Sequence, residues 1–285
     1  LLGAVVDGGR LRILSVLGFG GFATVLLAVE IKTGSKLALK CLPVTRHDSH
    51  SFALQCIELE AHLRVNDHPN IITLHRIIEH DAYVIFVLDY CAGGDLQRPL
   101  EDTTSHQIMN NGPLLKHIFT QVLDAVAHCH SLGVYHRDLK PNNFLCSPDL
   151  SNVFLCDFGL ATMDALSGQF RLGSKAYMSP ECIREHIRVS LCPTPQSDVW
   201  SLGVMLYCFF TAHRPWSCAI LTDEFYSRYE RMPESLFEEY DAAPEVMNLI
   251  FDALQPNPYR RISIEAFRKR FAQINQFYCH PKALS

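Results

Sequence analysis

The hydrophobic pattern of this 285-residue chain changes from strands to helices at one short segment, CAGG at residues 91–94. Before it, five apolar β-rich runs surround a single helical segment, and after it helical spacing dominates. The pattern predicts one α+β domain over residues 1–285 with two lobes. A small strand-rich lobe covers residues 1–90, and a larger helical lobe covers residues 91–285.

The local signals predict where the main elements lie. Strands are expected over residues 11–17, 25–30, 36–42, 71–78 and 83–89, and a helix over residues 51–65. In the larger lobe, Pro113 suits the start of a helix and Gly133 its end. Ser197 is the predicted N-cap of an apolar helix that begins at the next residue, and residues 264–275 form the last helix.

The charge and cysteine content disfavour several classes of protein. The net charge of -5 argues against non-specific nucleic-acid binding. Eleven scattered cysteines without a Cys-x-x-Cys pair predict buried or free thiols in a reducing intracellular compartment, cytoplasm or nucleus, rather than a disulfide framework or a zinc site. The longest apolar stretch, residues 202–212, is shorter than the ~20 residues that a bilayer requires. It predicts a buried core helix and no membrane association.

A glycine cluster, GFGGFATV at residues 18–25, lies between the first two predicted strands. Glycine lets backbone N–H groups approach a triphosphate, although a simple tight hairpin is the alternative. Lys40 follows on the third predicted strand, where it can pair with phosphates. A strand-end lysine in solvent is the alternative, which the preceding glycine cluster disfavours. Glu58 and Glu60 on the next helix both qualify as carboxylate partners of Lys40.

The segment HRDLKPNN at residues 136–143 brings together an acid, a base and a carboxamide. These groups can accept a hydroxyl proton, neutralise a migrating phosphate and hold a metal ion. The sequence DFG at residues 157–159 comes directly after an apolar run that predicts a strand over residues 153–156. A three-residue sequence such as DFG is common by chance, but its position directly after a predicted strand, shortly after residue 143, makes it specific.

In this order the motifs resemble those of the eukaryotic protein kinase superfamily, over residues 11–271. The segments SPE at 179–181 and DVWSLG at 198–203 extend the resemblance, and LKP together with Ser174 is similar to the serine/threonine type. The flanking segments CHSLGVY and YMSPEC look like fungal Ran-type kinases of meiosis and nutrient control. The resemblance implies a bilobal kinase domain. Such a domain transfers the γ-phosphoryl group of ATP, with Mg²⁺, to serine or threonine hydroxyls of protein substrates.

The resemblance also implies the catalytic roles. Asp138 is the expected base that orients the attacking hydroxyl, and Lys140 neutralises charge on the γ-phosphoryl group. Lys40 pairs with the α- and β-phosphates. Alignment on HPNI at residues 68–71 favours Glu58 as the partner of Lys40.

Two magnesium ligands and a nucleotide cradle are implied as well. Asn143 and Asp157 are the expected metal ligands. Leu88 is the expected gatekeeper, and the backbone after it is expected to hydrogen-bond adenine. Asp95 is placed to meet the ribose hydroxyls or a substrate arginine, with a helix N-cap as the structural alternative. The full set of implied nucleotide contacts is Gly18, Gly20, Phe22, Val25, Ala38, Lys40, Leu88, Asp89, Cys91, Asp95 and Leu145.

Three structural contacts are expected around this site. Glu181 is expected to pair with Arg261, and Asp198 to brace the catalytic loop. His62 lies one helical turn after the favoured glutamate and is expected to stack toward Phe158 as a buried, neutral, hydrogen-bonded side chain. A pH-sensitive arrangement of its helix is the alternative.

The activation segment departs from the kinase pattern at the position that is usually phosphorylated. Arg137, beside the catalytic aspartate, usually meets a phosphorylated residue in this family. The corresponding position here is Phe170, and Ser167 is the nearest hydroxyl upstream. The hypothesis is that activity requires no phosphate at the usual position.

Two further residues suggest hypotheses about substrates and inhibitors. Asn142 stands where kinases selective for basic substrates often have glutamate, so selection for arginine close to the acceptor is expected to be weak, while Asp95 still attracts an upstream arginine.

Cys156 precedes the DFG segment and is expected to pack at the floor of the nucleotide site. It should also be reachable by an electrophile attached to an inhibitor.

Two other functions compete with an active protein kinase. A pseudokinase scaffold acts by shape, but the residues that separate it from an enzyme, Lys40, Asp138, Asn143 and Asp157, are all present. A small-molecule kinase is disfavoured by the segment 174–181, which resembles a peptide-docking platform. The sequence does not specify the physiological substrate or the oligomeric state.

Overall fold

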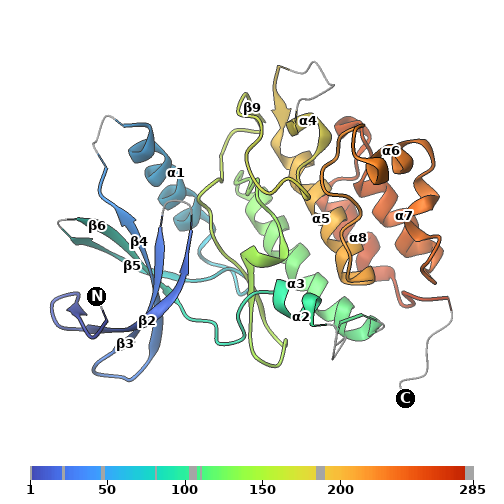
Figure 1. Ribbon diagram of the computed structural model, residues 1–285. Helices are drawn as coiled ribbons and strands as arrows, with labels where there is room; N and C mark the ends of the chain where they lie inside the picture. Colours follow the sequence, from blue (N-terminus) through green and yellow to red (C-terminus); the bar gives the residue numbers. More distant parts are fainter. Residues whose placement is uncertain are drawn as a thin grey trace.

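The computed structural model describes residues 2–20, 23–45, 49–80, 82–102, 108–109, 111–183 and 190–279. Figure 1 shows a strand-rich lobe with one helix beside a larger helical lobe. This is the two-lobed α+β architecture that the change of pattern at residues 91–94 predicts. No helix within these described ranges is long and apolar enough to cross a membrane.

The small lobe is built on a six-stranded antiparallel sheet with the strand order β1-β2-β3-β4-β6-β5. Leu26 and Leu39 are among the apolar side chains that it buries. The register places Lys40 between Val25 on one neighbouring strand and Phe86 on the other. The strands are β1 (Val5–Val6), β2 (Leu11–Phe19), β3 (Thr24–Glu30), β4 (Lys36–Pro43), β5 (Leu74–His80) and β6 (Tyr83–Asp89).

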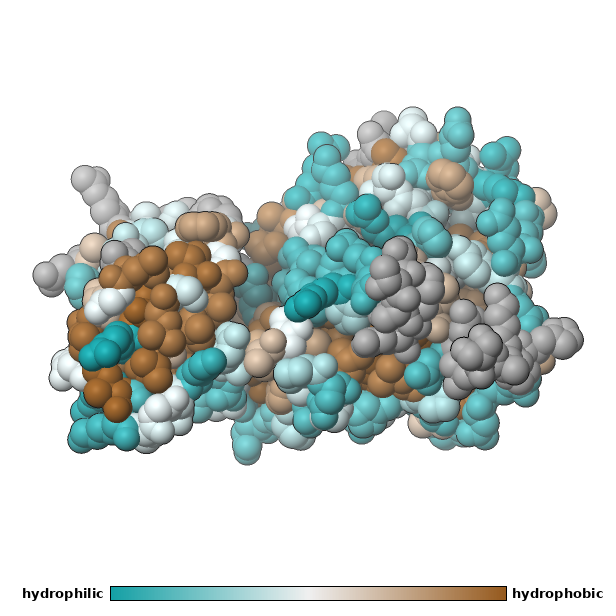
Figure 2. Space-filling model, turned by 60° about the horizontal axis from the view of Figure 1, so that its bottom comes forward, coloured by the Kyte–Doolittle hydropathy of each residue, from teal (hydrophilic) through white to brown (hydrophobic). Residues whose placement is uncertain are grey.

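The outer surface of this lobe remains partly apolar. Val5, Leu14 and Val16 of β1 and β2 keep 47%, 42% and 44% of their surface exposed. Figure 2 shows apolar surface gathered on the small lobe, whereas the visible face of the helical lobe is mostly polar. Antiparallel sheets commonly bury one face and leave the other open.

Helix α1 (His50–Val65) connects the small lobe to the core of the larger one. It begins at Ser49, whose hydroxyl accepts a hydrogen bond from a first-turn N–H at 3.1 Å. Ala61 and Val65 near its end are fully buried in the hydrophobic core that extends through the helical lobe. This anchoring fixes the position of Glu58, one turn before Ala61.

The larger lobe packs its helices around α5 (Thr194–Thr211), which is buried along most of its length. Helix α3 (Gly112–Ser131) packs against α5 and α8 (Ile264–Gln273), and α7 (Pro244–Ala253) also packs against α5. A Cβ at Gly203 would lie 2.8 Å from the Ala253 side chain, so glycine permits the close crossing of α5 and α7. The remaining helices are α2 (Gln97–Glu101), α4 (Pro180–Ile183), α6 (Glu224–Arg231) and the 3-10 turns Pro141–Asn143, Pro233–Phe237 and Pro258–Arg260.

Two small antiparallel sheets hold the loops between these helices (Figure 1). Strand β7 (Phe144–Cys146) pairs with β8 (Val153–Leu155), directly between the HRDLKPNN and DFG segments. Strand β9 (Leu166–Ser167) pairs with β10 (Cys192–Pro193), which leads into α5. The second sheet therefore holds the segment after DFG against the start of the central helix.

Some predicted element boundaries are wrong. Strand β5 is shorter than expected because Ile71 instead forms a bridge with Leu155 of β8. Ser197 is not an N-cap, because α5 begins three residues earlier with Pro195 in its first turn. The Ser197 hydroxyl instead lies 3.0 Å from that of Ser179. The last helix ends at residue 273 rather than 275.

The expectation that all cysteines are thiols is met only in part. Cys182 of α4 and Cys192 of β10 form a disulfide, so the expectation of thiols alone is wrong for this pair. Their spacing of ten residues carries no recognisable motif. The fold, and not local sequence, brings α4 and β10 together.

Candidate active site

The HRDLKPNN segment forms a loop that Asp198 holds in a strained conformation. Arg137 has a φ of 65°, in the left-handed region that side chains other than glycine rarely adopt. The buried Asp198 carboxylate accepts hydrogen bonds from the backbone N–H groups of His136 at 2.9 Å and Arg137 at 2.8 Å. His130 Nε2 lies 2.9 Å from the same carboxylate. The predicted brace is present, and His130 of the CHSLGVY segment is a member of it to which the sequence reasoning assigned no role.

Asp138 is the centre of a polar cluster at this loop. Its Oδ2 accepts a hydrogen bond from Lys140 Nζ at 2.7 Å, and its Oδ1 accepts one from the Ser174 N–H at 2.8 Å. Lys140 also donates to the Ser174 hydroxyl at 2.8 Å. Asn143 donates from Nδ2 to the Asp138 carbonyl at 2.7 Å. The structure thus brings together the catalytic residues that the sequence predicted here, and Ser174 contacts both Asp138 and Lys140.

Gly173 permits this close approach of the activation segment to the catalytic loop. Its φ is 100°, and a Cβ at this position would lie 2.7 Å from the Arg137 carbonyl oxygen and 3.2 Å from Asp138 Oδ1. A side chain here would push the backbone away from the loop. The glycine therefore sets the position of Ser174.

Lys40 joins the two lobes through two carboxylates. Its Nζ contacts Oε1 of Glu58 on α1 and lies 2.7 Å from Oδ1 of Asp157. Burial lowers the pKa of Lys40, but Asp157 and Glu58 more than offset this, so the net pKa is raised and the ammonium is charged. Glu60 instead meets Arg64 on the helix surface at 3.0 Å. The preference for Glu58 over Glu60 is confirmed.

Asp157 and Asn143 offer oxygen atoms that suit a magnesium ion. Burial raises the pKa of Asp157, but the Lys40 ammonium lowers it further than burial raises it, so the carboxylate is ionised. The contacts of this carboxylate among the described residues, from Lys40 and the Gly159 N–H, fall on Oδ1, which leaves Oδ2 for a cation. Because Asn143 directs its Nδ2 toward Asp138, its carbonyl oxygen remains an acceptor. Magnesium prefers such oxygen donors.

Phe158 packs between histidines from the two lobes. Its buried ring lies 4.9 Å from His62 of α1 and 5.3 Å from His136, measured between ring centroids. His62 Nε2 lies 2.8 Å from the Ile72 carbonyl, and burial lowers the pKa of His62 to about 4. The predicted buried, neutral, hydrogen-bonded histidine is confirmed. His136 Nε2 lies 3.1 Å from the Cys156 carbonyl, so this histidine packs against Phe158 and contacts the backbone just before Asp157.

The glycine cluster forms the hairpin between β2 and β3. Gly18 pairs with Val25 across it, and the Gly20 N–H donates to the Ala23 carbonyl at 2.8 Å. Ala23 stands where the kinase loop has its third glycine, and the turn still closes. Phe22, another predicted nucleotide contact, lies outside the described residues.

The other predicted nucleotide contacts lie at the junction of the lobes. Ala38 of β4 is opposite Leu88 of β6, and Asp89 ends that strand just before Cys91. Residues 89–91 form the hinge between the lobes. Asp95 and Leu145 face each other in an isolated bridge between the segment after this hinge and β7. The hinge is therefore held against the hairpin that follows the catalytic loop.

Asp95 and the nearby thiols differ in how far they fit the predictions. Asp95 lies one residue before Leu96, the N-cap of α2, and accepts from the Arg98 N–H at 3.2 Å, so it bonds to the first turn of α2 without being the N-cap residue. Burial raises the pKa of Cys91 to about 11 and that of Cys156 further still. Both thiols are protonated near neutral pH, which opposes the alkylation expected at Cys156.

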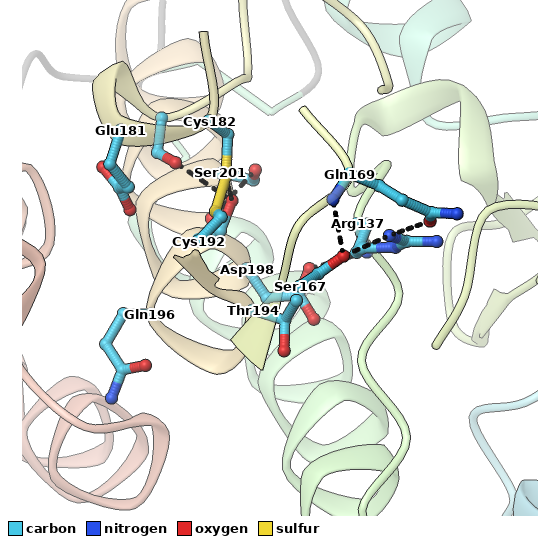
Figure 3. The surroundings of a disulfide bond; sticks show 12 residues. Arg137, Ser167, Gln169, Glu181, Cys182, Cys192, Thr194, Gln196, Asp198 and Ser201 are labelled. Carbon is cyan, nitrogen blue, oxygen red and sulfur yellow. Dashed lines mark hydrogen bonds between the residues drawn. A yellow bond between two sulfur atoms is a disulfide. The ribbon is translucent and has the colours of Figure 1, made fainter. Parts of the chain in front are cut away.

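The Arg137 side chain is satisfied by neutral groups of the activation segment (Figure 3). Nε donates to the Leu160 carbonyl at 2.6 Å, while Nη1 donates to Gln169 Oε1 at 2.9 Å and to Ser167 Oγ at 3.3 Å. Sequence reasoning singled out Ser167 but missed Gln169, because no motif marks a glutamine in this segment.

The predicted ion pair of the larger lobe is also present. Arg261 donates to both oxygens of Glu181, at 2.7 and 2.9 Å, and both side chains are buried. The Arg261 guanidinium lies 4.9 Å from the ring centroid of Trp200. The pair anchors the end of the activation segment to the helical core.

Comparison with known families agrees with this geometry. The family model described as the protein kinase domain matches residues 11–271. The chain belongs to the protein kinase family. The negative regulator of sexual conjugation and meiosis of Schizosaccharomyces pombe is 38% identical to it over 283 residues, which cover 93% of this kinase chain and 60% of that protein.

Two further relatives are named serine/threonine-protein kinases. VHS1 of Saccharomyces cerevisiae is 34% identical, and the match covers 77% of this kinase chain and 50% of VHS1. The kinase ksp1 of S. pombe is 33% identical, and the match covers 85% of this kinase chain and 52% of ksp1. The domain is therefore of the serine/threonine type, and its similarity to fungal kinases agrees with the sequence resemblance. The kinase chain spans about half to three fifths of the length of these relatives. Membership of the family implies ATP as phosphoryl donor and protein as acceptor.

Proposed function

We propose that this kinase domain is catalytically active and transfers the γ-phosphoryl group of ATP, with Mg²⁺, to serine and threonine hydroxyls of protein substrates inside the cell. The observation that carries the proposal is the cluster of Asp138, Lys140 and Ser174, together with the Lys40–Glu58 pair. A scaffold that acts only by shape has no need of either arrangement.

Asp138 is placed to orient the attacking hydroxyl. Its Oδ2 already accepts from Lys140 and Asn143, whereas its Oδ1 accepts from the Ser174 N–H alone among the described residues. A carboxylate oxygen accepts two hydrogen bonds, so Oδ1 keeps capacity for a substrate hydroxyl. The Lys140 ammonium, 2.7 Å from Oδ2, can stabilise charge that develops on the transferring group without moving.

The residues around the phosphates divide the remaining tasks. Asp157 and Asn143 would hold Mg²⁺, which neutralises phosphate charge when it is bound. Lys40 binds the α- and β-phosphates, and Glu58 keeps its ammonium directed toward them. The two lobes thereby position donor and acceptor for in-line transfer.

The contact between Asp95 and Asn142 supports a specific substrate preference. Asn142 Nδ2 donates to Asp95 Oδ2 at 3.1 Å. An amide at position 142 adds no negative charge, so Asp95 is the acid that attracts an upstream arginine. We expect weak selection for arginine nearer the acceptor, because a second carboxylate is missing there.

One peptide array tests both the chemistry and the selectivity. The array varies the acceptor among serine, threonine and tyrosine, and places arginine at each upstream position. For the wild type, we expect transfer to serine and threonine only, with arginine selected at one upstream position. For Asn142→Glu, we expect arginine to be selected at a second upstream position as well. Absence of transfer from ATP and Mg²⁺ contradicts the proposed activity, and equal selection at two upstream sites in the wild type contradicts the role of Asn142.

The proposed intracellular location is supported by cysteine chemistry. Cys56 and Cys279 are exposed thiols outside the disulfide, which suits a reducing compartment. Fractionation of cells that express the full-length protein tests this, and recovery in the secreted fraction contradicts it.

A further inference from the structure

Cys182 and Cys192 link two elements that border the activation segment. Cys182 lies on α4, next to the anchoring Glu181, and Cys192 lies on β10, just before α5. Their Cα atoms are 5.7 Å apart, within the range that a disulfide spans, and the bond joins them (Figure 3). In the sequence, residues 184–191 connect α4 to β10.

Each cysteine contacts the middle of the activation segment through its backbone, on either side of residues 168–170. Cys192 pairs with Ser167 in the β9–β10 ladder. The Cys182 carbonyl accepts a hydrogen bond from the Arg171 N–H at 2.9 Å. Residues 168–170, which include the position usually phosphorylated, lie between these two anchors. The disulfide therefore fixes the positions of Ser167 and Arg171 relative to each other. These two residues flank Phe170, which is expected at the position that other kinases phosphorylate.

The surroundings of the pair favour a reversible bond. Exposed thiols at Cys56 and Cys279 suit the reducing compartment proposed above, in which disulfides are usually transient or redox-sensing. Cys182 is only partly buried, whereas Cys192 is buried, so Cys182 is the more accessible residue of the pair.

The reduced form has a polar environment ready for it. Ser197 Oγ lies 3.3 Å from Cys182 Sγ, and Ser179 Oγ lies 3.0 Å from that of Ser197. These hydroxyls can hydrogen-bond a thiol or thiolate at Cys182. The buried Glu181–Arg261 pair holds α4 independently of the sulfurs, so reduction loosens the anchors without unfolding the lobe.

We propose that Cys182 and Cys192 form a reversible redox modification site, and that the disulfide holds the activation segment in its peptide-binding conformation. The proposal rests on the kinase activity proposed above and names a regulator of that site. It assigns to a disulfide the ordering role that a phosphate has in many kinases.

Peroxide is the class of oxidant that can form the bond. The Cys182 thiolate attacks one peroxide oxygen, the O–O bond breaks, and the released hydroxide takes up the thiol proton to form water. The Cys192 thiol then attacks the sulfenic sulfur, an S–S bond forms, and a second water leaves. Two thiols thus lose two electrons to one hydrogen peroxide, and a dithiol reductant reverses the change.

The test measures peptide and ATP kinetics in both redox states of the same protein. Wild type is reduced with a dithiol or oxidised with hydrogen peroxide, and the state is verified by mass spectrometry after trypsin. Arg184 and Arg188 separate the cysteines, so the disulfide links the tryptic peptides of residues 176–184 and 189–228. We expect the peptide KM to rise at least about fivefold on reduction and the ATP KM to change less than about twofold.

Variants separate this site from other thiols. Cys182→Ser and Cys192→Ser should each show the reduced-state peptide KM and lose the response to peroxide, whereas Cys56→Ser should respond like wild type. Equal peptide KM values in the two verified states of wild type overturn the inference even if both serine variants fail to fold. Absence of transfer in both states overturns the proposed activity, whereas transfer that ignores the redox state overturns the redox site alone.

Discussion

The guanidinium of Arg137 donates a hydrogen bond to Oε1 of Gln169 at 2.9 Å, within the activation segment. In many kinases an arginine in this role binds a phosphorylated residue and so orders the segment. Here the acceptors are neutral, and the residue expected at the position of the modified one, Phe170, has no hydroxyl. The arrangement explains how the segment reaches Asp138 through Ser174 without added charge.

The first prediction is that activity does not depend on phosphorylation of the segment. Phosphatase treatment and Ser167→Ala should each change kcat/KM less than about threefold. Gln169→Ala should lower it about tenfold, because hydrogen bonds to charged groups contribute about 1.5 kcal/mol or more. Gln169→Glu, which keeps the acceptor, is the control and should retain activity. Loss of activity in both Ser167→Ala and the phosphatase-treated enzyme contradicts this account.

The second prediction concerns the choice between two glutamates on α1. Glu58→Gln should lower kcat/KM about 10²-fold, because the Lys40 ammonium loses the charge that directs it toward the phosphates. Glu60→Gln is the matched control, since Glu60 only meets Arg64 on the surface at 3.0 Å, and should stay within about twofold. Steady-state kinetics with varied ATP measure both. Similar losses in the two variants are incompatible with the observed pairing.

The third prediction is that His62 makes the fold acid-sensitive. Burial lowers the pKa of His62 to about 4, against about 6.5 in the unfolded chain. Between these values the unfolded state binds more protons, so stability is fully present above pH 6.5 and falls as the pH drops toward 4. The charge on Lys40 lowers the pKa of His62 and the charge on Asp157 raises it, but burial has a larger effect than either.

Denaturant unfolding at two pH values measures this contribution. From pH 7.5 to 4.5 the two pKa values give a loss of about 2.5 kcal/mol in the free energy of unfolding. His62→Leu should lose less stability than wild type over the same interval by about this amount. Parallel pH profiles for the two proteins would show that His62 does not carry the effect.

The fourth prediction concerns the buried pair of Arg261 and Glu181. Arg261→Met leaves the Glu181 carboxylate buried without its partner, which should cost about 3–5 kcal/mol of stability. Arg260 is the neighbouring exposed residue, so Arg260→Met should change stability by no more than about 0.5 kcal/mol. Thermal unfolding compares the two. A small effect at Arg261 means that the pair is dispensable.

The sequence predicts most of the catalytic site because its motifs are local. Resemblance to the kinase motifs placed Lys40, alignment on residues 68–71 favoured Glu58 as its partner, and the four-residue spacing from Glu58 to His62 placed the packing against Phe158. By contrast, no local signal links Gln169 to Arg137, which lie far apart in the sequence and meet only through the course of the activation segment.

Errors in the sequence reasoning have the same physical origin. Ser197 has the chemistry of an N-cap, but Pro195 and the β9–β10 pairing start α5 earlier. Cys182 and Cys192 have no motif spacing, and their meeting depends on how α4 packs beside β10. Tertiary contacts decided both outcomes, and a single sequence does not display them.

The most direct measurement is turnover of a serine peptide by dephosphorylated wild type and by Asp138→Asn, with ATP and Mg²⁺. Asn keeps the size of the side chain but cannot accept the hydroxyl proton. We expect kcat on the order of 1 s⁻¹ or more for the wild type and a loss of about 10²–10⁴-fold in the variant, with ATP binding retained. Wild-type turnover no faster than that of Asp138→Asn would contradict the account, because the observed cluster would then have no catalytic role.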